Sequence, residues 1–169
     1  SSKEVADIDR WVSFCQHVVE QWQPRLLQTD TCYVFTDASH EGYACIIACK
    51  DQGGRWRRLL GRGRTYKPYQ KAWAIASSKI ELLALQLGVE VMKYVIRVLQ
   101  DAPDRCRPRR IVFGTDNETV LNRFQSGAFD AIADNWERKV SLAVNNALAN
   151  LGACICLLYT SDAADEEDS

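Results

Sequence analysis

The chain has 169 residues, of which 47% are hydrophobic and 25% charged, so its length and composition suit one compact globular domain. No apolar run approaches the roughly 20 residues that cross a bilayer, and the N-terminus carries no charged-then-apolar export signal. The seven cysteines are odd in number and scattered, which argues against a disulfide framework, and with two histidines they form no zinc motif. These features predict an intracellular protein in a reducing compartment, with no membrane partner.

The first half of the chain predicts one helix followed by three strands. Apolar residues recur at helical spacing between Glu4 and Gln23, and Pro24 ends the pattern, so residues 1–30 are expected to form a lead-in helix and its connection. Runs rich in β-branched and aromatic residues predict strands at 32–37, 43–49 and 55–60. The segment Asp51-Gln-Gly-Gly54 lies between the last two strands and is typical of a hairpin turn.

The second half predicts three helices and two further strands. Helical spacing covers residues 78–99, with one apolar stripe formed by Ile80, Leu83, Leu87, Val91, Val95 and Val98. A strand at 111–116, a helix capped near Asp116 or Asn117 that runs to Phe124, a helix at 133–151 and a strand at 153–159 follow. The order β-β-β-α-β-α-α-β predicts an α/β fold in which helices flank a mixed five-stranded sheet.

Three carboxylates occupy positions where an unpaired charge is costly. Asp37 and Asp116 each follow an apolar strand, and Glu81 lies near the start of the long helix among apolar residues. Three carboxylates together repel one another, and a hard divalent ion bound between them, above all Mg²⁺, would make the arrangement favourable. Each residue also has an ordinary explanation, because Asp116 can cap the following helix and Glu81 can belong to a capping box that begins at Ser77 or Ser78.

Three short motifs together resemble RNase H. They are Thr36-Asp-Ala-Ser39, Lys79-Ile-Glu-Leu-Leu-Ala-Leu85 and Gly114-Thr-Asp-Asn-Glu-Thr-Val-Leu121. In order and context they are similar to the first three acidic motifs of RNase H, most of all in retrotransposon polyproteins where a reverse transcriptase precedes this module. The resemblance implies an RNase H-like fold over residues 31–155. It also implies that residues 1–30 resemble the connection to the polymerase.

The same resemblance implies the site. Asp37, Glu81 and Asp116 would be the catalytic, metal-binding carboxylates for Mg²⁺ or Mn²⁺, with two ions in the intact family site. Asn117 stands where the family often has serine and would lie near the RNA strand. Two related nuclease classes fit less well: a proofreading-type exonuclease would carry a glutamate where Ser39 stands, and an integrase-type site would carry one where Leu151 stands.

Basic and aromatic residues interleave in one segment. The basic residues are Arg55, Arg57, Arg58, Arg62, Arg64, Lys67 and Lys71, and the aromatic residues are Trp56, Tyr66, Tyr69 and Trp73. Such a segment is expected to follow a phosphate backbone. The predicted substrate-binding residues are Ser39, Asn117, Arg57, Arg62 and Lys67. For Trp56, Tyr66 and Trp73 the alternative to base stacking is packing against the sheet, which is the more ordinary role.

The last residues have the character of a foreign tail. The segment from Cys156 to Glu166 matches the translation of a common transposase-based sequencing adapter, so residues 156–169 are predicted to be non-native. The family's fourth carboxylate lies in an Ala-Asp context near the C-terminus, and Ala164-Asp165 matches it superficially. Because this pair falls within the tail, Asp165 is only a weak fourth candidate, with Asp162 as a rival.

The expected function is that of a metal-dependent endonuclease that cleaves the RNA strand of RNA–DNA hybrids within a retroelement polyprotein. Its partners would be the hybrid and an upstream reverse transcriptase domain, in the cytoplasm or a virus-like particle. The competing class is a catalytically inactive RNase H-like module that binds nucleic acid or supports a neighbouring polymerase.

Overall fold

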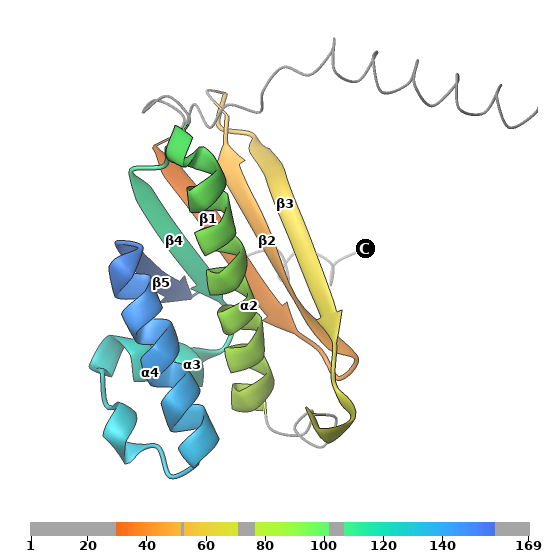
Figure 1. Ribbon diagram of the computed structural model, residues 1–169, viewed down its shortest axis with the longest axis vertical. Coiled ribbons are helices and arrows are strands. Elements are labelled where there is room, and N and C mark those ends of the chain that lie inside the picture. The colour runs from red at the N-terminus through yellow and green to blue at the C-terminus, as the bar shows by residue number, and fades with distance from the viewer. Residues whose placement is uncertain (1–29, 52, 71–76, 102–106, 158–169) are drawn as a thin grey trace, which may run out of the picture.

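The computed structural model describes residues 30–51, 53–70, 77–101 and 107–157, so the helix expected between Glu4 and Gln23 lies outside them. Along the chain the elements are β1 (Thr31–Ala38), β2 (Gly42–Lys50), β3 (Trp56–Thr65), α2 (Ser77–Val98), β4 (Arg110–Thr115), α3 (Glu118–Ser126), α4 (Asn135–Asn150) and β5 (Ala153–Leu157). The predicted order of strands and helices is confirmed (Figure 1).

One mixed sheet of five strands organises the domain, in the order β3-β2-β1-β4-β5. The first three strands form antiparallel pairs, whereas β4 and β5 run parallel to β1. Strand β1 is central because it pairs with both β2 and β4. Cys32, Val34 and Thr36 alternate with less buried residues and face the helices. The predicted α/β fold with a mixed five-stranded sheet is therefore correct.

The third strand is longer than the sequence predicted. It was expected at residues 55–60, but β3 continues to Thr65, which pairs with Gly42 at the start of β2. The extension has low intrinsic strand propensity because it contains Gly61 and Gly63. Pairing with β2 overrides that preference, and a register shift beside Ile47 lets the two strands stay aligned along their whole length.

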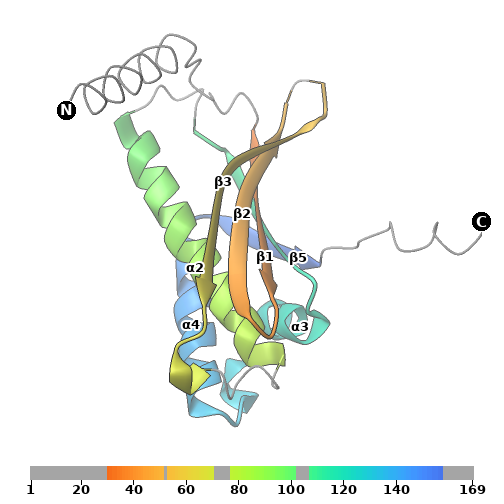
Figure 2. The same cartoon turned by 90° about the vertical axis from the view of Figure 1, so that its right-hand side faces the viewer.

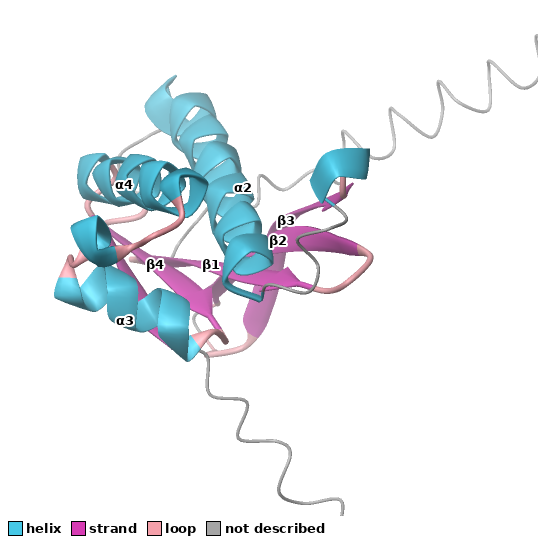
Figure 3. Cartoon of the chain, turned by 90° about the horizontal axis from the view of Figure 1, so that it is seen from below, coloured by secondary structure: helices cyan, strands magenta, loops and turns pink. Residues whose placement is uncertain are grey.

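Helices α2 and α4 pack side by side on one face of the sheet (Figures 2 and 3). The predicted apolar stripe of α2 holds for its first turns, since Ile80, Leu83 and Leu87 are buried. Towards the end of the helix it fails, because Val98 is 58% exposed. Additional buried residues on other sides of α2 are Leu82, Leu85 and Met92. The first turns are enclosed between the sheet and α4, so their burial is not confined to one stripe.

A glycine sets how closely α2 approaches the sheet. A Cβ at Gly88 would lie 2.9 Å from Thr36 Cγ2, 3.0 Å from Val34 Cγ1 and 3.2 Å from Phe113 Cε1. These distances leave no room for a side chain without movement of β1 or β4. Gly88 therefore holds the helix that carries Glu81 tightly against the two central strands.

The first residues of the predicted foreign tail form part of the sheet. Cys156 and Leu157, the first residues of the predicted foreign tail, still pair with β4, whereas Asp162 and Asp165 lie outside the described residues. Cys45 and Cys49 of β2 are buried free thiols. Within the described ranges, no helix is both long enough and apolar enough to traverse a bilayer.

Candidate metal centre

Asp37 and Asp116 come together because their strands are parallel neighbours. β1 and β4 pair with Phe35 opposite Gly114, so the two aspartates stand at equivalent positions two residues further along. The carboxyl ends of parallel strands share one edge of the sheet, which is where α/β folds place ligands. In Figure 1 this edge lies towards the bottom of the domain.

A threonine precedes each aspartate and directs it outward. Thr36 and Thr115 are each 1% exposed, and because side chains alternate along a strand, the next residue leaves the core. Asp37 and Asp116 are accordingly exposed. Thr36 Oγ1 donates a hydrogen bond to the Gly114 carbonyl at 3.1 Å, which links the two strands immediately before the aspartates.

Glu81 reaches the same edge from α2. It is the fifth residue of the helix, so the predicted capping box at Ser77 or Ser78 is wrong, and no acidic residue lies in the first turn. Its side chain is 5% exposed, and the Ala38 backbone N–H donates to the carboxylate. Glu81 Oε2 has no hydrogen-bond partner among the described residues. A buried oxygen left in this state is costly unless a ligand completes it.

Asn117, and not Asp116, caps the helix that follows β4. Asn117 Oδ1 accepts a hydrogen bond from the Val120 N–H at 3.0 Å, and its backbone is extended, as an N-cap requires. The alternative in which Asp116 serves only as a helix cap is therefore excluded. Its carboxylate is left to face Asp37 and Glu81.

The three carboxylates form one cluster of like charge. Asp37, Glu81 and Asp116 each place an oxygen within 4.8 Å of the other two. Burial, followed by the charges of Asp116 and Asp37, raises the pKa of Glu81 to about 8. None of the ion pairs in the described ranges involves these three residues. The cluster thus carries negative charge that no positive side chain among the described residues neutralises, and a bound cation would neutralise it.

The donor set of the cluster selects the kind of cation. It consists of carboxylate oxygens alone, which are the ligands of hard ions such as Mg²⁺, Ca²⁺ and Mn²⁺ rather than of softer transition metals. The orphan oxygen of Glu81 and the exposed carboxylates of Asp37 and Asp116 fit such an ion from three separate elements. The residues present therefore fit a divalent metal.

Comparison with known proteins assigns the family. Residues 10–115 match the family model of the Pao retrotransposon-like RNaseH-like domain. The chain belongs to this family. The matched region contains Asp37 and Glu81 and ends at Thr115, one residue before Asp116. The assignment of Asp116 to the cluster therefore rests on the geometry of the fold.

Solved RNase H structures share the fold of this Pao retrotransposon-like domain at low sequence identity. LC11-RNase H1, isolated from compost by a metagenomic approach, is 10% identical and superposes with a TM-score of 0.53, covering 78% of this chain and 86% of that chain. RNase H1 from the halophilic archaeon Halobacterium salinarum is 12% identical, with a TM-score of 0.52 and coverage of 77% and 86%. No curated protein matches the chain in sequence.

The predicted substrate-binding residues of this Pao retrotransposon-like domain do not all lie at one place. Ser39 lines a hollow of about 410 Å³ together with Asp37, and Asn117 adjoins Asp116 although its Oδ1 is used by the helix cap. Arg57 lies at the opposite end of β3 from Thr65 and pairs with Asp51 at 3.0 Å. Along an extended strand that separation is roughly 26 Å, so Arg57 is remote from the carboxylates.

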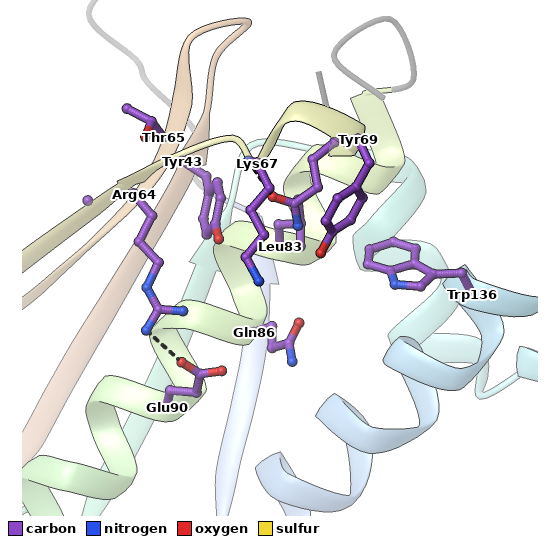
Figure 4. A pocket seen from close by; sticks show the side chains of 11 residues that line it. Tyr43, Arg64, Thr65, Lys67, Tyr69, Leu83, Gln86, Glu90 and Trp136 are labelled. Atoms are coloured by element: carbon purple, nitrogen blue, oxygen red, sulfur yellow. Dashed lines mark hydrogen bonds and ion pairs between the residues drawn. The ribbon is translucent and has the colours of Figure 1, made fainter. Parts of the chain in front are cut away.

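Arg62 and Lys67 lie nearer to the carboxylate edge. Arg62 pairs with Cys45 in the second half of β3. Lys67 follows the end of β3, and its ammonium group lies 5.9 Å from the centre of the Tyr69 ring. Lys67 also lines a groove of about 790 Å³ between the end of β3, helix α2 and the start of α4 (Figure 4).

Sequence reasoning missed one residue of this groove and left another out of the predicted substrate-binding set. Arg64, which was named only as part of the basic segment, forms an ion pair with Glu90 of α2 at 3.1 Å. Trp136, which was missed, closes the far side from the first turn of α4 (Figure 4). Trp136 lies in the first turn of α4, just after the helix cap Asp134. Its position opposite Lys67 depends on how α4 packs on α2, which the sequence pattern does not report.

Packing, the more ordinary alternative, holds for Tyr66 and in part for Trp56, which is 51% exposed, whereas Tyr69 is 61% exposed. Tyr66 is 6% exposed and its hydroxyl donates to the carbonyls of Ser39 and Gly42 at 2.5 and 3.0 Å. Trp56 makes edge contacts with Tyr33 and Phe35 on the sheet face that points away from α2. Trp73 lies outside the described residues.

Proposed function

We propose that this domain is a metal-dependent endonuclease that cleaves the RNA strand of RNA–DNA hybrids within a retroelement polyprotein, downstream of a reverse transcriptase. The observation that carries the proposal is the cluster of Asp37, Glu81 and Asp116, in which a buried carboxylate oxygen lacks a partner. A structural role does not explain the cluster, because three acidic groups repel one another when no cation is bound.

Each of the three carboxylates has its own role in holding the metal. Asp37 and Asp116, exposed at the strand ends, would hold Mg²⁺ or Mn²⁺ where a nucleic acid can approach, and Glu81 would complete the ligand set from the buried side. A bound divalent metal supplies an activated water and stabilises the leaving oxygen of a phosphodiester. The family's complete site holds two such ions, and Asp165 is at most a weak candidate for its fourth carboxylate.

The surroundings of the carboxylates suit a nucleic-acid backbone. Ser39 lines the hollow beside Asp37, and Arg64 borders both this hollow and the groove that contains Lys67. Cationic side chains at this end of β3 would contact phosphates, whereas choice of the RNA strand would depend on its 2′-hydroxyls and on the shape of the hybrid. LC11-RNase H1, which shares the fold, has been solved in complex with an RNA/DNA hybrid, at 9% identity and a TM-score of 0.50.

Hybrid cleavage by the full chain tests the proposal. A labelled RNA–DNA hybrid, an RNA duplex and a DNA duplex are incubated with the protein in Mg²⁺, in Mn²⁺ and in a chelator. We expect metal-dependent cuts in the RNA of the hybrid alone, and a fall to background in the Asp37→Asn, Glu81→Gln double variant. Asp130→Asn makes the same chemical change at an exposed carboxylate outside the cluster and should cleave as the unaltered chain does.

Two outcomes count against the proposal. Cleavage retained by the double variant would reject the metal site. Hybrid binding without cleavage in either metal would favour the second class of function, a non-catalytic RNase H-like module.

A further inference from the structure

A buried carboxylate on α4 connects three helices near the metal centre. Glu137 is 7% exposed, and both of its oxygens have partners on other helices. Arg123 Nη1 of α3 donates to Oε2 at 2.6 Å, and Ser78 Oγ of α2 donates to Oε1 at 3.3 Å. Figure 3 shows α2, α3 and α4 gathered at this end of the domain.

The two partners of Glu137 lie on the elements that carry the metal carboxylates. Ser78 lies three residues before Glu81 at the start of α2. Arg123 lies in α3, the helix that begins directly after Asp116 and its neighbour Asn117. One side chain therefore tethers the helix of Glu81 and the helix that follows Asp116 to a common point.

A second contact supports the tether from the same helix end. Asp134 caps α4 by accepting the Glu137 N–H at 2.9 Å, which orients the first turn of that helix. Asp134 Oδ2 also accepts from Lys79 Nζ at 2.6 Å. The first turn of α2 is thus bonded to α4 by two successive residues, Ser78 and Lys79, immediately before Glu81.

Such a tether matters because the metal carboxylates repel each other. In the ionised form that binds a metal, Glu81 is repelled by the charges of Asp37 and Asp116 until a cation is bound. A buried ion pair such as Arg123–Glu137 contributes little net stability compared with apolar packing of the same volume. What its hydrogen bonds supply here is a defined position for both helices, and metal ligands tolerate displacements of only about 0.5 Å.

We propose that Glu137 is a positioning residue for the metal centre, which acts through Ser78 and Arg123 to hold Glu81 and Asp116 at ligand distance. The inference rests on the proposed function and deepens it by naming a residue outside the ligand set that controls metal affinity. Partners that orient metal ligands typically change affinity by about 10- to 100-fold when they are removed.

Calorimetric titration of the full chain with Mn²⁺ measures the effect. Glu137→Leu and Arg123→Leu should each weaken Mn²⁺ binding by about 10-fold or more. Glu137→Gln keeps one acceptor oxygen, which can still accept from Arg123, while its NH₂ group can donate to Ser78 Oγ, so this variant should recover part of the loss. Val144→Ala is the control, because it leaves a cavity at a buried position of α4 and loosens that helix without touching the polar contacts.

The outcomes separate this inference from the proposed function. If the unaltered chain binds no Mn²⁺, the proposed function fails and the inference fails with it. If the unaltered chain and the folded Glu137→Leu and Glu137→Gln variants all bind Mn²⁺ equally, only the inference fails. An equal loss of affinity in Val144→Ala would also overturn it, because general loosening of α4 would then explain the result. Should Glu137→Leu not fold, Glu137→Gln is compared with Val144→Ala. A larger loss of Mn²⁺ affinity in Glu137→Gln than in Val144→Ala would support the inference, and the absence of such a difference would overturn it.

Discussion

Replacing Glu81 by glutamine should stabilise the metal-free protein at neutral pH. The folded state holds the pKa of Glu81 at about 8, through burial and then through Asp116 and Asp37, against an ordinary value of 4.5. Below pH 4.5 the group is protonated in both states and has no effect on stability. Between pH 4.5 and 8 the unfolded chain releases the proton while the folded chain keeps it, so stability falls as the pH rises.

The size of the effect follows from that difference in pKa. A rise from 4.5 to about 8 corresponds to roughly 5 kcal/mol of lost stability above pH 8, and to roughly 3 kcal/mol at pH 7. Glutamine does not ionise and keeps an oxygen for the Ala38 N–H, so Glu81→Gln should recover most of this at pH 7. At pH 4 the variant and the unaltered chain should differ little.

Urea unfolding in a chelator at pH 4, 7 and 8.5 measures the difference. The free energy of unfolding of Glu81→Gln should exceed that of the unaltered chain by an amount that grows with pH, while Asp130→Asn should show no such trend. Adding Mn²⁺ should reverse the order, because metal binding stabilises only a chain that retains its ligands. A variant that is less stable at pH 7, or equally more stable at pH 4 and pH 7, would refute the reasoning.

Three further changes test other parts of the structure. Gly88→Ala should lower the free energy of unfolding by about 1–3 kcal/mol, because its Cβ would lie 2.9 Å from Thr36 Cγ2, and urea unfolding checks this. Asn117→Ala should cost about 1 kcal/mol through the loss of the α3 cap, whereas Asn117→Ser should cost less; thermal unfolding of the pair distinguishes a cap from a mere surface residue. Lys67→Ala should weaken hybrid binding and reduce the slope of log K against log salt by about one, and an unchanged slope would remove Lys67 from the phosphate contacts.

Much of the fold could be predicted because its signals are local. The β-branched and aromatic run between Cys32 and Asp37 identified a strand before any partner was known, and helical spacing identified α2 and α4. The end of α3 likewise has a local cause, since Gly127 follows the helix and adopts a φ of 66° that suits glycine. These patterns depend on neighbouring residues, so one sequence is enough to read them.

Other features depended on contacts between distant segments. The end of β3 was misplaced because its glycines gave no strand signal and only pairing with β2 extends it to Thr65. The choice between Asp116 and Asn117 as helix cap was open until the geometry showed which side chain accepts from Val120. Glu137 carried no signal at all, since its partners lie on two other helices.

The sequence by itself singled out the candidate metal ligands: two aspartates at the ends of predicted strands, Asp37 and Asp116, and a glutamate early in a long helix, Glu81. Only the tertiary structure decided that the three meet within 4.8 Å, that Glu81 is buried there with one unpartnered oxygen, and that Arg57 lies far away. The physical reason is that a side-chain pattern reports the local backbone alone. The meeting of Asp37, Glu81 and Asp116 requires β1 and β4 to pair in parallel and Gly88 to let α2 settle against them.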